Sequence, residues 1–303
     1  MTLHEFRQKL PGLRVWKQDG KRAPHKPLLL LLAIGKAVRG EERLVPFSEI
    51  EDTLTGLLRH FGPPSKPRPE FPFGRLVSDG LWEIPEANSL RRTGSGDLSP
   101  LELRTGGITG GLPKPLYRLL VGDHPGARAA AQQILDEHFP VSMHQHILEA
   151  VGLDAIERED SKATKRASRD PRFRELVLIA YERRCAICGF DLRLDDDLLG
   201  LEAAHIRWHS HGGPDHVTNG LALCTFHHGA FDRGALGLDE NASGVGYRVV
   251  VSPLVNGQSA ARDWLRDYHG EPLRPPQSGA AEPAGAYVAW HAKQVFRAAP
   301  PGL

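Results

Sequence analysis

Four thiol and imidazole side chains in the second half of this 303-residue chain share one spacing. Cys185 and Cys188 form a C-x-x-C pair, and Cys224 and His227 repeat it further along. A structural zinc takes four sulfur or nitrogen ligands, commonly as two close pairs joined by a longer loop. The pairs use all three cysteines, so they favour a structural Zn²⁺ over a disulfide framework. Three unrelated buried thiols explain the two matched pairs less well, and His228 as the fourth ligand would consume a histidine that hydrolytic chemistry needs.

A second set of side chains suits hydrolysis of a phosphodiester, which needs a base for water and a cation at the phosphate. His205 suits the base, because neutral imidazole accepts a proton near pH 7. His228 suits a ligand of a catalytic divalent ion such as Mg²⁺ or Mn²⁺. Asp232 lies on the same helical face and either adds an oxygen ligand or caps the next turn. Asn219 is expected to fix His205 or the loop through amide hydrogen bonds.

Short elements must bring these residues together. The expected elements are a helix from Asp170-Pro171 to Arg183-Arg184, a strand over 198–206, a loop over 209–218, a strand over 220–223 and a helix that opens at His227. Their order is strand, loop, strand, helix.

The segments Ala203-Ala204-His205, Asn219 and Cys224-x-x-His227-His228 resemble the HNH, or ββα-metal, nuclease family over residues 170–250. The resemblance implies that His205 is the general base, Asn219 the orienting residue and His228 a metal ligand, beside the structural zinc. Many members carry a metal ligand where Ala204 stands. Asp232 is favoured to fill that gap, ahead of water, weak metal binding or Glu202. Glu202 lies three residues from His205 on a strand, which predicts opposite faces.

The first half mixes helix and strand signals. The expected helices are His25–Arg39, one with a Ser48/Glu51 capping box that runs to His60, one from Ser99-Pro100 and one over 125–138. Apolar runs over 71–77 and 81–84 enclose Asp79-Gly80, a pattern typical of a β-hairpin. We therefore expect an α+β protein with a mixed helix and strand DNA-recognition domain over 1–155, a basic linker over 156–169 and an HNH nuclease domain over 170–303.

Cations and small apolar surfaces recur in the first half, at His25-Lys26-Pro27, Phe71-Pro72-Phe73, Arg75, Asp79-Gly80-Leu81-Trp82 and Arg91-Arg92. This set resembles the sulfur-binding domain of type IV, McrA-like restriction endonucleases that depend on phosphorothioate DNA and carry an HNH domain after it. The resemblance implies that Phe71 and Pro72 form a cup for sulfur, a large and poorly hydrated atom. It places His25 and Lys26 at the modified phosphate, and Arg92, with Arg91 or Arg75, at a phosphate or base edge.

Composition limits the alternatives. The formal net charge is +1, so a DNA-binding surface must be local. The apolar run Leu28–Ile34 is too short to span a membrane, and the polar N-terminus lacks a signal-peptide pattern, which favours a soluble cytoplasmic protein. Apolar residues at helical spacing over 287–296 predict a helix that packs on the nuclease domain or on a partner subunit.

The leading hypothesis is an endonuclease that recognises phosphorothioate-modified double-stranded DNA and cuts nearby. A cut through both strands by one-metal centres predicts two active sites and hence a homodimer. The alternatives are an HNH endonuclease that acts on methylated or unmodified DNA, and a zinc-stabilised DNA-binding protein without catalysis. The absence of an acid at Ala204 is the best support for the last.

Overall fold

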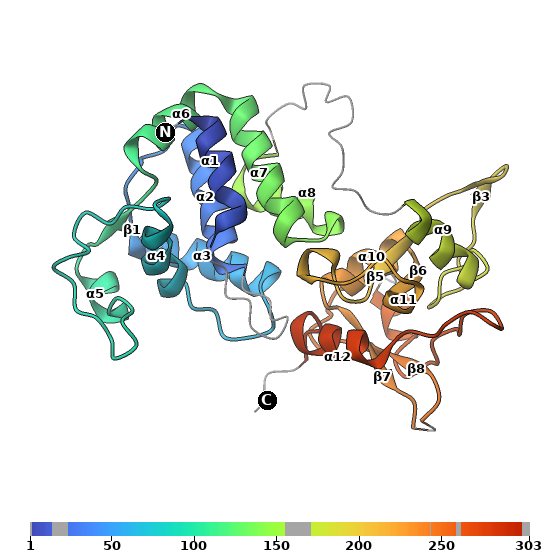
Figure 1. Cartoon of the computed structure of the whole chain (residues 1–303). Coiled ribbons are helices and arrows are strands. Elements are labelled where there is room, and N and C mark those ends of the chain that lie inside the picture. The colour runs from blue at the N-terminus through green and yellow to red at the C-terminus, as the bar shows by residue number, and fades with distance from the viewer. Residues whose placement is uncertain (1, 14–23, 155–170, 243, 259–261, 299–303) are drawn as a thin grey trace. The chain divides into compact units, whose positions relative to one another are not determined.

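The computed structural model describes residues 2–13, 24–154, 171–242, 244–258 and 262–298. The chain divides into two compact units, Met1–Lys162 and Ala163–Leu303 (Figure 1). The expected basic linker over 156–169 lies outside the described residues, and the domain bounds 1–155 and 170–303 stay a prediction. Within the described ranges, no helix is long and apolar enough to cross a membrane.

The first unit is mainly helical. Its elements are α1 (Leu3–Lys9), η1 (Leu10–Gly12), α2 (His25–Val38), β1 (Val45–Pro46), α3 (Phe47–Phe61), α4 (Glu70–Arg75), η2 (Leu76–Asp79), α5 (Pro100–Thr105), β2 (Thr109–Gly110), α6 (Lys114–Gly122), α7 (His124–His138) and α8 (Val141–Val151). β1 and β2 pair antiparallel, with Val45 opposite Gly110.

Helix α2 is the centre of this unit. Its run from Leu28 to Ile34 is buried on every side, and α3, α4, α6, α7 and α8 all pack against it. Gly35 permits the close approach of α8, because a Cβ there would lie 2.0 Å from the carbonyl oxygen of Val151. The helix expected over His25–Arg39 is confirmed, and Gly40 follows its end with a φ of +69°.

The hairpin expected across residues 71–84 is wrong. Its first half forms α4 and η2, and Gly80 ends η2 in the left-handed conformation with a φ of 67°. Phe73 is fully buried between Phe47 and Trp82, with ring centroids 4.9 and 5.6 Å away. Short apolar runs do not distinguish strand from buried helix, and here Pro72, Phe73 and Leu76 form a helical inner face.

The expected capping box at Ser48 and Glu51 is also wrong, although the helix itself is present. Helix α3 begins at Phe47 with Pro46 as its N-cap residue, and no side chain caps it. The backbone N–H of Phe47 donates to the carbonyl oxygen of Ile108 at 2.8 Å, so the residue before β2 fixes the chain one residue before Ser48. By contrast, the Ser99 hydroxyl caps α5 as expected.

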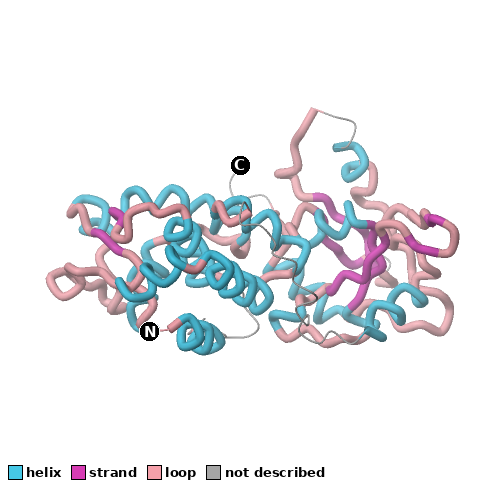
Figure 2. The backbone as a smooth tube through the Cα atoms, turned by 90° about the horizontal axis from the view of Figure 1, so that it is seen from above, coloured by secondary structure: helices cyan, strands magenta, loops and turns pink. Residues whose placement is uncertain are grey.

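The second unit groups short strands between helices (Figure 2). Its elements are α9 (Pro171–Ala180), β3 (Arg193–Leu194), β4 (Asp197–Leu198), β5 (Leu201–His205), η3 (His209–His211), η4 (Val217–Asn219), β6 (Gly220–Cys224), α10 (Thr225–Asp232), β7 (Leu236–Glu240), β8 (Tyr247–Val251), α11 (Asp263–Arg266) and α12 (Gly285–Gln294). The strands pair in sequence order as antiparallel hairpins: β3 with β4, β5 with β6 and β7 with β8.

The core of this unit forms around the β5–β6 hairpin. Both α9 and α10 pack against β5 and β6, and α10 also packs against β7. Val177, Leu221 and Phe231 are fully buried there. The expected order of strand, loop, strand and helix is confirmed, and so is the α+β class. The long strand expected from residue 198 is shorter, because Leu198 belongs to β4. Helix α9 ends at Ala180, before the arginine pair that was expected to close it.

Candidate active site and metal centres

Four side chains from two segments of the chain converge at the start of α10. The ligand atoms of Cys185, Cys188, Cys224 and His227 all lie within 4.8 Å of one another. His227 Nδ1 lies 3.3 Å from Cys224 Sγ and 3.6 Å from Cys185 Sγ. With zinc bonds of about 2.3 Å to sulfur and 2.0 Å to nitrogen, tetrahedral ligands stand about 3.6 Å apart. His227 Nε2 lies 3.5 Å from the carbonyl oxygen of Trp264, which suits Nδ1 as the ligand atom.

Electrostatics explains why this cluster fits a cation. Hydrogen bonds from Cys188 and Cys224 hold the pKa of the Cys185 thiol far below its usual range, whereas those with Cys185 and Cys188 raise the pKa of Cys224. Burial lowers the pKa of His227, but contacts with Cys185 and Cys188 outweigh burial and raise it to about 9. Three adjacent thiols cannot all ionise without a shared positive charge. A zinc ion supplies that charge, so the donor set fits Zn²⁺.

The β5–β6 hairpin sends alternate side chains to two helices. His205 lies opposite Gly220 at one end of the pair, and its ring stacks on Phe173 of α9 with centroids 4.1 Å apart. Glu202, on the alternate face of β5, reaches His228 of α10. Gly220 is required beside α9, because a Cβ there would lie 2.3 Å from Val177.

His205 is paired with an acid. Its Nε2 lies 2.7 Å from Asp215 Oδ1, and the two side chains are 8% and 16% exposed. A carboxylate at Nε2 favours the neutral tautomer with its proton there, which leaves the lone pair on Nδ1. The sequence interpretation missed Asp215. Its signal is an acid directly after Gly212-Gly213-Pro214, in the loop that follows the candidate base.

Asn219 orders the loop that carries Asp215. The Asn219 side chain is fully buried, and its Oδ1 accepts from the Arg207 N–H at 2.8 Å. Its Nδ2 donates to the carbonyl oxygens of Arg207 and Pro214, both at 3.0 Å. Gly213 allows this closure, because a Cβ there would lie 1.8 Å from the Arg207 carbonyl oxygen. Asn219 was expected to fix either His205 or the loop, and these hydrogen bonds fix the loop.

His228 lies between two carboxylates. Its Nδ1 lies 2.5 Å from Glu202 Oε2 and its Nε2 lies 3.1 Å from Asp232 Oδ2. Burial lowers the pKa of His228, but the two carboxylates outweigh burial and raise it to about 10. Asp232 is buried and also accepts from Trp208 Nε1 at 3.1 Å. One imidazole and two carboxylates are a donor set that fits Mg²⁺ or Mn²⁺.

Glu202 lies on the face of β5 opposite to His205, as expected, but that face meets His228, the predicted metal ligand. Glu202 lies two residues from Ala204, so both face α10, where Glu202 contacts His228. The Glu202 carboxylate thus lies on the same face of β5 as Ala204, two residues before it.

Helix α12 packs against residues that adjoin Asp232. Trp290 packs edge-on against Trp208, with centroids 5.9 Å apart, and Trp208 in turn holds Asp232. The His291 ring stacks on Phe231 at 3.7 Å, and its Nε2 contacts the carbonyl oxygen of Phe231 at 3.0 Å. The prediction that the C-terminal helix packs on the nuclease domain is confirmed.

In the first unit, arginines flank the half-exposed ring of Phe71. The guanidinium of Arg75 lies 4.3 Å from the ring centroid and that of Arg68 lies 5.8 Å away. Asp97 holds Arg75 through two hydrogen bonds of 2.6 and 2.8 Å, and Arg75 holds the pKa of Asp97 below its usual range. Arg92 lies near Asp97 as well. The structure therefore brings Arg75 and Arg92 to one carboxylate, and it places Arg75 against the Phe71 ring.

The other predicted recognition residues lie in different settings. Arg91 is 89% exposed and stands 3.4 Å from Glu102. Pro72 is buried on the inner side of α4, and His25 is half-buried at the first turn of α2. Lys26 is buried and pairs with Asp79 at 2.5 Å.

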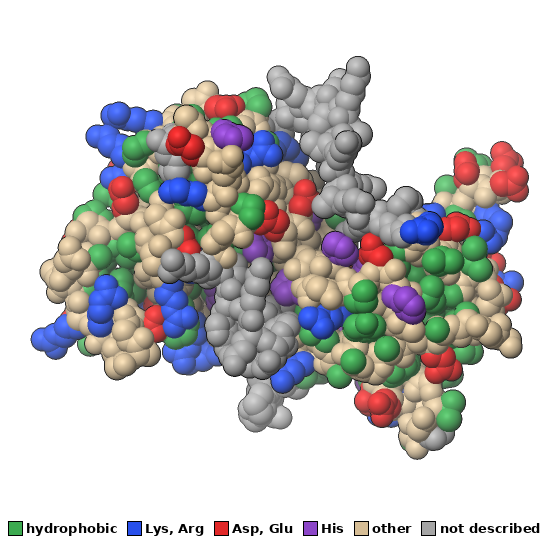
Figure 3. All heavy atoms as spheres, in the orientation of Figure 1, with side chains coloured by type: hydrophobic (Ala, Val, Ile, Leu, Met, Phe, Trp, Pro, Cys, Tyr) green, Lys and Arg blue, Asp and Glu red, His purple; other side chains and the backbone are tan. Residues whose placement is uncertain are grey.

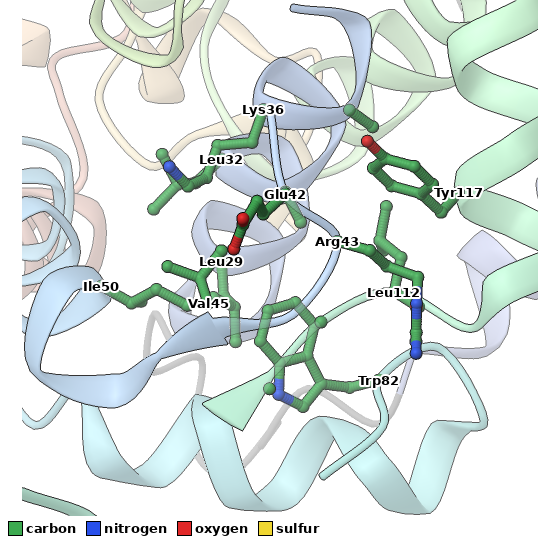
Figure 4. A pocket seen from close by; sticks show the side chains of 14 residues that line it. Leu29, Leu32, Lys36, Glu42, Arg43, Val45, Ile50, Trp82, Leu112 and Tyr117 are labelled. Carbon is green, nitrogen blue, oxygen red and sulfur yellow. The ribbon is translucent and has the colours of Figure 1, made fainter. Parts of the chain in front are cut away.

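An enclosed cavity in the core of the first unit is too small for a ligand. This cavity lies between Leu29, Val45, Trp82, Leu112 and Tyr117 and measures about 10 Å³ (Figure 4). Such a volume is that of one water molecule.

Comparison with known families identifies both units. A family described as ScoMcrA-like, DNA sulfur-binding domain, matches residues 3–156, half of the chain. The chain belongs to this family. A second family, HNH endonuclease, matches residues 185–239, which include the zinc cluster, His205, Asn219 and His228. Both resemblances inferred from the sequence are thereby confirmed. No curated protein sequence matches the chain.

Solved structures of ScoMcrA-like domains match the same half. The sulfur-binding domain of ScoMcrA complexed with phosphorothioated DNA is 28% identical, covers 49% of this chain and 95% of its own, and has a TM-score of 0.44. The sulfur-binding domain of SprMcrA complexed with phosphorothioated DNA is 25% identical, covers 51% and 96%, and has a TM-score of 0.43. In the type IV phosphorothioation-dependent restriction endonuclease ScoMcrA, the match covers 32% of that chain at 28% identity and a TM-score of 0.43.

Proposed function

We propose that this protein is an endonuclease that recognises phosphorothioate-modified double-stranded DNA with its first unit and hydrolyses a phosphodiester nearby with its HNH domain. It would act in the cytoplasm. One observation supports the proposal: a single chain joins a domain of the sulfur-binding family to an HNH domain in which His205 lies beside Asp215 and His228 lies beside Glu202.

Recognition rests on the Phe71 ring and its arginines. A non-bridging sulfur is more weakly hydrated than the oxygen it replaces, so it loses less on contact with an apolar ring. Arg75, held over that ring by Asp97, and the exposed Arg92 supply positive charge to the phosphates. Lys26 forms an ion pair with Asp79 and would have to break it to contact a phosphate. Before DNA binds, Lys26 therefore contributes only to the structure at the start of α2.

His205 acts as the general base. Asp215 holds the proton on Nε2 and directs Nδ1 toward the attacking water, and it stabilises the imidazolium that forms when Nδ1 takes the proton. Stacking on Phe173 fixes the plane of the His205 ring. Asn219 positions the loop from which Asp215 reaches His205.

Glu202, His228 and Asp232 form the site for the catalytic divalent ion. A bound Mg²⁺ or Mn²⁺ offsets the negative charge that develops at the scissile phosphate. His228 must lose its proton to serve as a ligand, because both ring nitrogens now face carboxylates. Cys185, Cys188, Cys224 and His227 hold the structural Zn²⁺, which fixes the start of α10 and so the place of His228.

The test is cleavage of two otherwise identical plasmids, one with and one without phosphorothioate linkages, in Mg²⁺ or Mn²⁺. We expect the modified plasmid to be cut and the other to remain intact. The His205→Ala variant should leave both uncut, and His216→Ala, in the exposed part of the same loop, is the matched control. Equal cutting of both plasmids would contradict the recognition role, and full activity of His205→Ala would contradict the catalytic role. Intact DNA under every condition would favour a DNA-binding protein without catalysis.

A further inference from the structure

The β3–β4 hairpin and its flanks, residues 190–199, form an arm with one exposed apolar face. The register pairs Leu194 with Asp197, and the backbone N–H of Leu199 donates to Leu192 at 2.9 Å. Because side chains alternate along each strand, Leu192, Leu194 and Leu199 share a face, with Asp197 opposite Leu194. They are 57%, 66% and 40% exposed. A two-stranded ribbon is marginal in water by itself, so a bare leucine face on it calls for a cover.

Helix α9 carries a second apolar surface beside the arm. Phe173 and Val177 face the β5–β6 hairpin, whereas Leu176 and Ile179, one helical turn apart, are 51% and 39% exposed. The two surfaces are neighbours, because Arg184, which follows α9, lies 3.7 Å from Asp191 at the base of the arm.

The charges on these two surfaces are opposite. The arm carries four aspartates and one arginine, a net charge of −3, and its acidic tip projects from the surface (Figure 3). Residues 172–184 carry four arginines and two glutamates, a net charge of +2. An arm of this charge repels DNA phosphates, so nucleic acid is not its cover. It requires a partner that is apolar and basic, as α9 together with the turn up to Arg184 is.

We propose that the arm and the outer face of α9 together form the contact surface between two copies of this chain. Across a two-fold axis a patch meets its own copy, so it must be self-complementary. A patch with an acidic half and a basic half meets that condition, because the arm of each copy lies on α9 of the other. The biological need rests on the proposed function: a break through both strands takes two HNH sites, and a dimer supplies them.

The first test is sedimentation velocity of the zinc-loaded full chain over a concentration series without DNA. We expect a monomer–dimer equilibrium in the wild type and a dissociation constant at least about tenfold higher in Leu194→Asp. Val245→Asp is the matched control, because Val245 is 71% exposed and lies outside the patch. Leu176→Asp, on the other surface, should weaken the dimer as Leu194→Asp does. Higher salt should also weaken it.

A second measurement compares products on phosphorothioate plasmid at low enzyme concentration. Leu194→Asp should keep nicking and lose most double-strand cleavage, whereas Val245→Asp should keep both. A wild-type chain that stays monomeric at every concentration would overturn the proposal, as would equal association of the arm variants and the control. Because sedimentation uses no DNA, a failure of the nuclease proposal leaves this outcome unaffected.

Discussion

Replacing the acid beside the candidate base, Asp215→Asn, should slow catalysis without weakening DNA binding. The carboxylate lies 2.7 Å from His205 Nε2 in a mostly buried pair. When the base takes a proton, the contact becomes a charge-assisted hydrogen bond. An amide keeps the shape but lacks the negative charge, and the rotamer that offers its NH₂ favours the wrong tautomer.

The size of the effect follows from that bond. A hydrogen bond to a charged group contributes about 1.5–3 kcal/mol, and about 1.4 kcal/mol corresponds to a factor of ten in rate. We therefore expect the cleavage rate constant to fall by about 10- to 150-fold. The assay is single-turnover cleavage of a phosphorothioate duplex at saturating enzyme and metal, from pH 6 to 9.

Three results separate this role from a merely structural one. The pH–rate profile should shift to lower pH, because a base that lacks its carboxylate partner holds its proton less tightly. The metal concentration for half-maximal rate should not change, because Asp215 is not among the proposed ligands. Asp239→Asn, which removes an exposed carboxylate from an ion pair with Arg248, is the control. A wild-type rate and pH profile for Asp215→Asn would refute the assignment.

Three further predictions concern metal and stability. Cys185→Ser should lose the bound zinc and lower the melting temperature of the second unit, because folding of such a site depends on its ion. Glu202→Gln should raise the Mn²⁺ concentration for half-maximal cleavage by about tenfold, because a charged oxygen ligand is lost. Tyr181→Phe should leave neutral-pH stability unchanged or raise it by about 1 kcal/mol, because the buried hydroxyl has no hydrogen-bond partner among the described residues. Burial, with Glu282, raises the pKa of Tyr181, so wild-type stability should fall above pH 10 and that of the variant should fall less.

Each of these three predictions has a result that would contradict it, and the two metal predictions have a control variant. Zinc content measured by atomic absorption should stay at one ion per chain in His216→Ala, and a fully loaded Cys185→Ser would contradict the cluster. Glu240→Gln, at an exposed position of the same unit, should leave the Mn²⁺ dependence unchanged, and an unchanged midpoint for Glu202→Gln would remove Glu202 from the site. Denaturant unfolding at pH 7 and 11 tests Tyr181→Phe, and an equal loss of stability in both proteins would contradict the cause.

The local patterns that the sequence predicts correctly are those with one physical solution. Paired two-residue spacings converge on one cluster that includes Cys185 and His227, and the apolar run from Leu28 to Ile34 is a buried helix. The order of strand, loop, strand and helix around His205 follows from short segments with clear boundaries. The helical packing of residues 287–296 follows from periodicity in the same way.

The errors arise where tertiary contacts decide. Residues 71–77 fit a strand or a helix equally well, and burial of Phe73 between two aromatic rings selects the helix. The carboxylate that contacts His205 belongs to Asp215, ten residues further along the chain. The loop closed by Asn219 brings Asp215 Oδ1 to 2.7 Å from His205 Nε2. Glu202 reaches His228 because the face of β5 opposite to His205 packs against α10, a contact between elements that the strand pattern alone does not give.

The most direct measurement of the central claim is the affinity of the full chain for one duplex with and without sulfur at a single phosphate. The His205→Ala variant, without added Mg²⁺ or Mn²⁺, keeps the DNA intact during a fluorescence-anisotropy titration at fixed salt. We predict that the sulfur-bearing duplex binds at least about tenfold more tightly, a difference of about 1.4 kcal/mol, and that Phe71→Ala abolishes most of the difference. Equal affinity for the two duplexes would contradict the account.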